Sequence, residues 1–156
     1  MQKIVTCLGF NNQAEEAVNF YTSIIENSRI LSTTRFGDAG PGPKGGLIAA
    51  SFVLDGQEFI ALNGGPSFTH TVGMSIMVKC ETQAEIDELW NRLIEGGGQP
   101  NMCGWLTDKF GVSWQIVPRA LPQLLSHPEQ KKSQAALQAM LQMRKLDIAA
   151  LEAAAG

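Results

Sequence analysis

A short motif occurs twice in this chain, and its repetition constrains the fold more than any other feature. Gln13-Ala14-Glu15 recurs as Gln83-Ala84-Glu85, each time after a short apolar segment and before an amphipathic one. A repeat that keeps its order and spacing along the chain indicates two related structural units. The alignment superposes Phe20 on Trp90 and Ile24 on Ile94, and further along Gly56 and Phe59 match Gly111 and Trp114.

The first half predicts a strand, a helix and three further strands. After a strand in residues 2–10, Asn12 and Glu15 resemble a capping box, and apolar residues at helical spacing follow as far as Asn27-Ser28. The segment GDAGPGPKGG (37–46) must form a loop because of its glycines and prolines. Further strands are predicted in residues 29–36, 47–54 and 58–63, the last two joined by a tight turn at Asp55-Gly56.

The second half repeats this order and continues into a helical tail. An apolar strand in residues 72–80 leads to Thr82 and Glu85, a capping box that opens the second helix, and Gly96-Gly97-Gly98 ends it. Short strands follow in residues 103–106 and 112–117. Pro128-Glu129 then opens a tail of two helices. The stripe of Ala, Leu and Met along this tail must pack against its own sheet or against a partner chain.

Charge and composition exclude several classes of partner. The chain has 156 residues, 44% of them hydrophobic, and a net charge of −3, which argues against binding nucleic acid or an anionic membrane surface. No segment approaches the roughly eighteen apolar residues of a membrane span, and the first ten residues do not resemble a secretory signal. The three cysteines are far apart and odd in number, which argues against a disulfide framework. We expect a cytoplasmic protein.

The combination of motifs resembles the vicinal-oxygen-chelate superfamily of glyoxalase I, extradiol dioxygenases and bleomycin-resistance proteins, and within it the PhnB-like branch. The resemblance covers nearly the whole chain. It is carried by segments 13–17 (QAEEA), 19–21 (NFY), 40–43 (GPGP), 55–57 (DGQ), 61–66 (ALNGGP), 103–106 (CGWL), 108–111 (DKFG), 113–118 (SWQIVP), 140–143 (MLQM) and 145–148 (KLDI).

The resemblance implies an α+β fold in which two βαβββ modules form a curved mixed sheet around a cleft, with a C-terminal helical tail. We expect a single domain over residues 1–156, with module 1 in about 1–66, module 2 in about 70–118 and the tail in 119–156. The superfamily commonly pairs modules within or between chains. We therefore expect a homodimer, with the tail at or near its interface.

The resemblance also places the usual metal ligands, commonly two histidines and two glutamates, near Thr6, Ala61, Ser75 and Gln115. None of these side chains suits a hard divalent ion, and a lone amide oxygen does not hold one. His70 and His127 are predicted in a linker and in a tail loop, away from these strands. We expect no metal site and no cofactor.

The predicted ligand-binding residues follow from the alternation of side chains along a strand. One set of alternate residues should face the cleft and the other should face the helix, although these side chains could equally serve only to fill the cleft. The predicted set is Thr6, Leu8 and Phe10 in the first strand, Ser75 and Met77 in its repeat, and Asn63, Cys103, Trp105 and Gln115 elsewhere.

Other chemical groups have a simpler structural interpretation. Cys103 as a nucleophile would need an activating base, and no histidine is predicted beside it. Asp108-Lys109 reads better as part of a turn than as an acid–base pair, and Cys7 and Cys80 read as core residues. The loop in residues 37–46 could act as a lid over the cleft or form only a hairpin tip. Arg35 before it could contact an anion.

Three functions are compatible with the sequence. The first is a metal-free small-molecule binding protein, which the unsuitable ligand positions favour. The second is an enzyme acting on a small metabolite, and the third is a protein whose dimer surface matters more than its cleft. Related proteins often carry the name demethylubiquinone methyltransferase. We disfavour methyl transfer, because no glycine-rich loop between a strand and a helix is present to hold a nucleoside cofactor.

Overall fold

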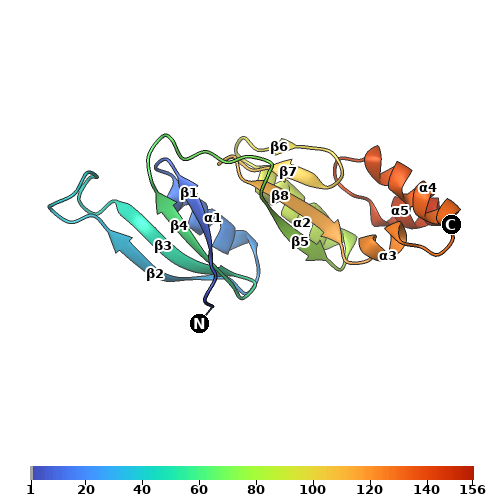
Figure 1. The fold of residues 1–156 in the computed structure, drawn as a ribbon, viewed down its shortest axis with the longest axis horizontal. Helices are drawn as coiled ribbons and strands as arrows, with labels where there is room; N and C mark the ends of the chain where they lie inside the picture. Colours follow the sequence, from blue (N-terminus) through green and yellow to red (C-terminus); the bar gives the residue numbers. More distant parts are fainter. Residues whose placement is uncertain (1) are drawn as a thin grey trace. The chain divides into compact units, whose positions relative to one another are not determined.

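The computed structural model describes residues 2–156 and divides into two compact units, one ending at His70 and the other spanning Thr71–Gly156. Each unit contains a four-stranded mixed sheet with a helix packed against it (Figure 1). The two-module α+β fold with a helical C-terminal tail is thereby confirmed, and the strands are divided between two sheets of identical topology.

The first unit is built from β1 (Thr6–Phe10), α1 (Ala14–Ile24), β2 (Arg29–Arg35), β3 (Leu47–Leu54) and β4 (Gln57–Asn63). The strands lie in the order β1-β4-β3-β2, with β1 parallel to β4 and the other neighbours antiparallel. Asp55 and Gly56 have φ values of 47° and 77°, the left-handed pair that a two-residue hairpin turn requires. The predicted turn is confirmed.

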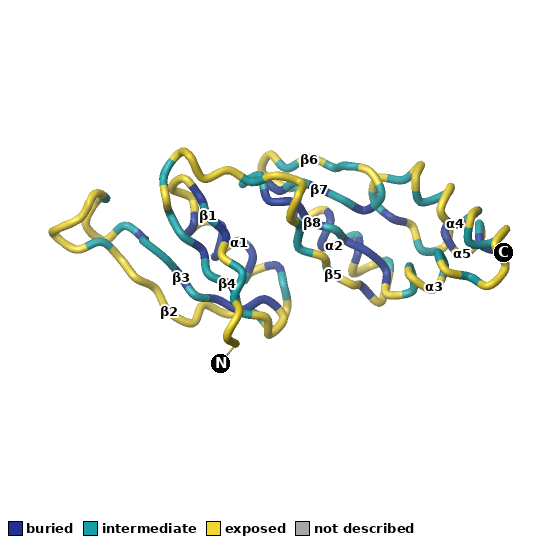
Figure 2. Tube along the Cα trace, viewed as in Figure 1, coloured by how far each residue is buried: buried dark blue, intermediate teal, exposed yellow. Residues whose placement is uncertain are grey.

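Helix α1 covers one face of the first sheet. Its buried residues recur at helical spacing, and they pack against strand residues that share one face because they are paired across the sheet. Phe52 and Phe59, for example, are Cα partners whose rings stack with centroids 5.5 Å apart. By contrast, all seven residues of β2 are exposed, as Figure 2 shows.

The N-terminus of α1 is capped from β4 and not by the predicted capping box. Gln13 occupies the N-cap position without a side-chain cap. Asn63 Oδ1 instead accepts a hydrogen bond from the Ala14 N–H at 2.9 Å, and Asn63 Nδ2 donates to the Leu47 carbonyl at 3.1 Å. The prediction at Asn12 and Glu15 is therefore wrong, because a strand residue satisfies the donor that a local cap would have satisfied.

The second unit repeats the topology. It comprises β5 (Ser75–Cys80), α2 (Gln83–Ile94), β6 (Gln99–Pro100), β7 (Trp105–Thr107) and β8 (Ser113–Pro118), in the order β5-β8-β7-β6. The short strand β6 was not predicted. Here the Thr82 half of the predicted capping box is confirmed, since Thr82 Oγ1 accepts from the Glu85 N–H at 3.2 Å. The Glu85 carboxylate accepts at 2.9 Å from the N–H of Glu81, the residue before the N-cap.

Asp108 anchors the turn between β7 and β8. It is 2% exposed, and its carboxylate accepts hydrogen bonds from the N–H groups of Phe110 and Val112 and from the indole N–H of Trp114. Three donors therefore converge on one buried carboxylate. The prediction that Asp108 and Lys109 belong to a turn is confirmed.

The tail contains three helices where two were predicted: α3 (Leu121–Leu125), α4 (Gln130–Leu141) and α5 (Ile148–Ala155). Leu146 and Leu151 are fully buried and form a cluster with Val117 at the end of β8. The tail thus contacts its own sheet through this cluster, one of the two arrangements expected for it, while its helices pack on one another and Leu137 and Leu141 stay exposed. None of the helices in residues 2–156 has the length and apolar composition needed to cross a membrane.

We predict that Asp108→Ala lowers the free energy of unfolding by about 3 kcal/mol or more, because it leaves three buried donors without an acceptor. Urea denaturation followed by circular dichroism measures this loss. Asp38→Ala is the control, since Asp38 is an exposed loop residue, and its effect should stay within about 0.5 kcal/mol. Equal effects of the two substitutions would contradict the assigned role of Asp108.

Candidate functional site

The second sheet has one face packed against α2. Its other face is covered only in part, since Ser113 and Val117 of β8 are buried on that side and Val117 packs against the tail. Trp114, Ile116 and Leu106 are fully buried and lie on the helix-packed face. The alternate residues point the other way. The open face is formed by Ser75 and Met77 of β5, Gln115 of β8, and Trp105 and Thr107 of β7, and none of these five residues is buried.

A row of three side chains crosses the open face. Met77 pairs with Gln115, and Gln115 pairs with Trp105, so the three lie side by side on neighbouring strands. Met77 is 48% exposed. The row combines an aromatic ring, a flexible thioether and an amide, side chains that can contact a flat apolar molecule and bind one polar group on it.

Two polar pairs flank this row. Gln115 Nε2 donates to Ser75 Oγ at 2.9 Å, and Asn101 Nδ2 donates to Thr107 Oγ1 at 3.0 Å. The Ser75 hydroxyl can still donate its own proton, and the Gln115 carbonyl oxygen can accept one. The structure thus brings together four of the predicted binding residues: Ser75, Met77, Trp105 and Gln115.

Cys103 lies in the turn that leads into β7 and not on the strand face. The Trp105 N–H donates to the Met102 carbonyl at 3.1 Å, and Cys103 and Gly104 have φ values of 62° and 84°. These are the features of a type I′ turn. Cys103 is half-buried, and its prediction as a ligand contact stays a prediction.

The predicted orientation of the first strand is wrong. Phe10 pairs with Asn63, which caps α1, and Leu8 pairs with Ala61, which is 0% exposed. Thr6, Leu8, Phe10 and Asn63 therefore share the face that α1 covers, and the side chains of Leu8 and Phe10 fill the core beneath the helix. We leave these four residues out of the proposed binding surface.

The residues of the first unit that correspond to the row in the second unit are Cys7, Ile60 and Ser51, which are paired across β1, β4 and β3. Cys7 is exposed, so its prediction as a core residue is wrong. The sequence did hold the necessary signal, because the offset that superposes Gln13 on Gln83 also superposes Cys7 on Met77.

The donor set does not fit the metal that the superfamily commonly holds. Ser75 and Gln115 bond to each other, and Ala61 is buried on the helix-packed face. Among residues 2–156, no three His, Cys, Asp or Glu side chains lie close enough together to hold an ion. His70 lies beside the ring of Phe10 in the first unit, and His127 Nδ1 accepts a hydrogen bond from the Glu129 N–H in the tail.

The glycine-rich loop between β2 and β3 closes on itself. The Phe36 N–H donates to the Gly46 carbonyl and the Gly45 N–H donates to the Phe36 carbonyl. Arg35 forms an ion pair with Glu15 and donates to the Gly45 carbonyl, and the hydrogen bond with Glu15 raises the pKa of Arg35. Arg35 therefore has a local partner, and its anion contact and the lid stay predictions.

Solved structures place this fold among known proteins. A PhnB protein from Bacillus cereus is 43% identical to the chain with a TM-score of 0.70, covering 75% of this chain and 99% of its own. Protein PA1353 from Pseudomonas aeruginosa is 28% identical with a TM-score of 0.62, covering 76% of this chain and 98% of its own. A glyoxalase/bleomycin resistance protein from Albidiferax ferrireducens T118 shares the fold at 16% identity with a TM-score of 0.50, covering 76% and 99%.

The repeated βαβββ units and these similarities define a protein of the vicinal-oxygen-chelate superfamily, as the sequence resemblance predicted. Within it, the chain belongs to the PhnB-like family described as 3-demethylubiquinone-9 3-methyltransferase, which it matches over residues 2–117. No curated protein matches the chain.

We predict that iodoacetamide at pH 8 modifies Cys7 in the folded protein and Cys80 only after denaturation. Burial, reinforced by the negative charge of Glu85, raises the pKa of Cys80 to about 12, and its side chain is 0% exposed. In the folded protein Cys80 therefore stays a protonated, inaccessible thiol. Because the thiol ionises more readily in the unfolded chain, the free energy of unfolding falls as the pH rises from about 9 toward 12. Peptide mass spectrometry with and without urea measures the labelling, and native labelling of Cys80 would contradict the assignment.

Proposed function

We propose that the open face of the second unit binds a small molecule without a metal ion. The observation that carries this proposal is the row Met77–Gln115–Trp105, which places an aromatic ring and a hydrogen-bonding amide side by side on an accessible sheet face. Sequestration of such a molecule fits these side chains better than catalysis does, because none of them is an acid, a base or an activated nucleophile.

The charge on this face indicates the kind of ligand. Lys79 pairs with Val117 and follows Met77 by two residues, so it lies on the same side of β5, and it is exposed. The strand residues on this face of β5, β7 and β8 include no Asp or Glu. We therefore propose a flat, largely apolar molecule with a carbonyl or anionic group.

Methyl transfer has no support in the geometry of the glycine-rich segment. That segment joins β2 to β3, whereas the connections from strand to helix are Asn11–Gln13, Glu81-Thr82 and Arg119-Ala120 and contain no glycine. A nucleoside cofactor is commonly held by a glycine-rich turn between a strand and the helix that follows it.

We predict that Trp105→Ala weakens binding of anilinonaphthalene sulfonate, a flat aromatic anion, by about tenfold, because the ring it would stack on is lost. Fluorescence titration of the folded protein measures the dissociation constant. Met77→Ala and Met74→Ala form a matched pair, since both methionines are exposed but only Met77 lies on the open face. Equal binding by Trp105→Ala and the unsubstituted protein would refute the site.

We predict that Mg, Mn, Fe, Co, Ni and Zn ions each shift the melting temperature by less than about 1 °C, because a ligand raises it only when it binds the folded state. Differential scanning fluorimetry, paired with elemental analysis of protein purified without chelators, makes this measurement. Stoichiometric metal or a clear shift with one ion would overturn the metal-free proposal. It would favour the alternative, an enzyme acting on a small metabolite.

The homodimer and the cytoplasmic location stay predictions. The exposed strand β2, with Ile30 41% and Leu31 44% exposed, is an unpaired sheet edge of the kind that joins subunits.

A further inference from the structure

The turn that precedes Trp105 has a backbone conformation that its sequence does not favour. A type I′ turn needs positive φ at both central residues, and Gly104 suits the second position, whereas the first holds Cys103 at φ 62°. A residue with a Cβ atom is disfavoured there unless its surroundings hold it in place. Trp105 is the last residue of this turn, so the conformation of the turn sets the position of the indole at the start of β7.

The tail supplies the contacts that hold this turn. The Cys103 N–H donates to the Met143 carbonyl at 2.7 Å, and the Gly104 N–H donates to the Arg144 carbonyl at 2.7 Å. Two successive N–H groups of the turn thus bond to two successive carbonyls of the tail. Leu146 packs directly on Gly104, where an added Cβ atom would lie 2.9 Å from Leu146 Cδ1.

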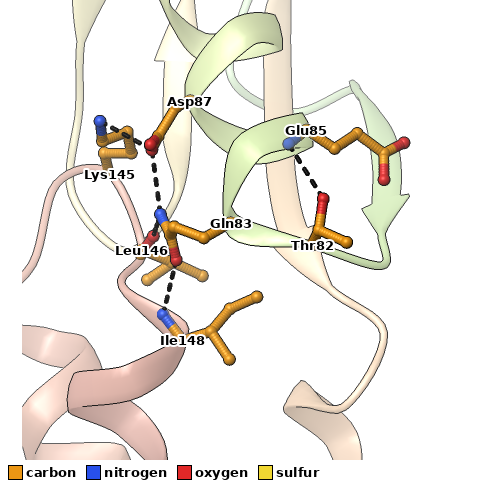
Figure 3. Close-up of polar contacts among 7 residues, drawn as sticks. All are labelled: Thr82, Gln83, Glu85, Asp87, Lys145, Leu146 and Ile148. Atoms are coloured by element: carbon orange, nitrogen blue, oxygen red, sulfur yellow. Dashed lines mark hydrogen bonds and ion pairs between the residues drawn. The ribbon is translucent and has the colours of Figure 1, made fainter.

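Gln83, the first residue of α2, holds this part of the tail in place, as Figure 3 shows. Its Nε2 donates to the Leu146 carbonyl at 3.0 Å, and its Oε1 accepts from the Ile148 N–H at 2.8 Å. Asp87, one helical turn further on, accepts from the same Nε2 and forms an ion pair with Lys145 at 2.9 Å. The Gln83 side chain therefore holds the part of the tail whose carbonyls hold the Cys103-Gly104 turn.

We propose that residues Met143–Ile148, held by Gln83, are a positioning element for Trp105 on the binding face. This inference rests on the proposed function for its ligand, and it assigns the tail a role in recognition beyond its packing on Val117. The tail lies outside the family match, which ends at residue 117, so the family comparison assigns it no role. Gln83 is a positioning residue that acts through the tail and does not lie on the open face.

The test uses Gln83→Met, which keeps the length of the side chain and removes both hydrogen bonds to the tail. Gln13→Met is the matched control, because Gln13 stands at the equivalent place before α1 and makes no side-chain cap. Trp90 and Trp114 are 5% and 0% exposed, so acrylamide quenching of fluorescence reports chiefly on Trp105. The three readouts are this quenching, the dissociation constant of anilinonaphthalene sulfonate, and the melting temperature.

We expect Gln83→Met to increase the quenching and to weaken probe binding about fivefold, well below the melting temperature of the variant. Adding Cys103→Gly should restore both readouts without restoring the lost hydrogen bonds, because glycine adopts the positive φ without help from the tail. Gln13→Met should change neither. Unchanged quenching and binding in a less stable Gln83→Met protein, or no recovery with Cys103→Gly, would overturn the proposal.

Ile148→Pro provides a second variant should Gln83→Met fail to fold. It removes the Ile148 N–H, which donates a hydrogen bond to Gln83 Oε1. Proline is tolerated there because Ile148 is the first residue of α5 and follows the extended Asp147. The same changes in quenching and binding are expected. If the probe binds the unsubstituted protein but not at Trp105, the proposed function fails, while quenching and its recovery by Cys103→Gly still decide the role of the tail.

Discussion

Each sheet of this protein is covered by one helix on one face, and this coverage determines which side chains remain available for function. Side chains alternate along a strand, so the choice of which face packs on the helix determines the face on which every strand residue lies. In the second unit, packing of Trp114 and Ile116 under α2 leaves Gln115 on the opposite face. The candidate site is therefore a direct consequence of how the core is packed.

The two units show how one backbone plan can carry different chemistry. Equivalent rows cross the two sheets, Cys7–Ile60–Ser51 in the first and Met77–Gln115–Trp105 in the second. Only the second combines an aromatic ring with a hydrogen-bonding amide. The topology shared with a PhnB protein of 43% identity establishes the fold of both units, whereas the chemistry of each face depends on the residues that this chain places there.

Local sequence signals predicted the elements well and their orientation less reliably. The Asp55-Gly56 turn and the Thr82 helix cap depend on neighbouring residues, and both are present. The cap of α1 comes from Asn63, far along the chain, and no local pattern predicts it. The face of β1 was misassigned because both sets of alternate residues in a short apolar strand are compatible with burial. The internal repeat, applied residue by residue, resolves that ambiguity.

Local sequence also does not predict the conformation of the turn at Cys103, because the carbonyls that hold its positive φ belong to the distant tail. The sequence predicts Trp105 and Gln115 in the binding set but does not predict the hydrogen bonds of Gln83 to the tail, because no residue near Gln83 in the sequence indicates them. Its partners lie 63 and 65 residues later, in a segment that read only as an amphipathic tail.

The long stretch of chain between Gln83 and its tail partners affects the order in which the second unit forms. Contacts between residues far apart in sequence form late, since the intervening chain must be ordered before they contribute to stability. On the ribosome, α2 and the turn before Trp105 emerge long before Leu146 and Ile148. The sheet can therefore assemble first, but the turn acquires its tail contacts only after synthesis has passed the start of α5. A nascent chain would thus hold the second sheet before it held the tail contacts at this turn, and before Leu146 and Leu151 completed their buried cluster with Val117.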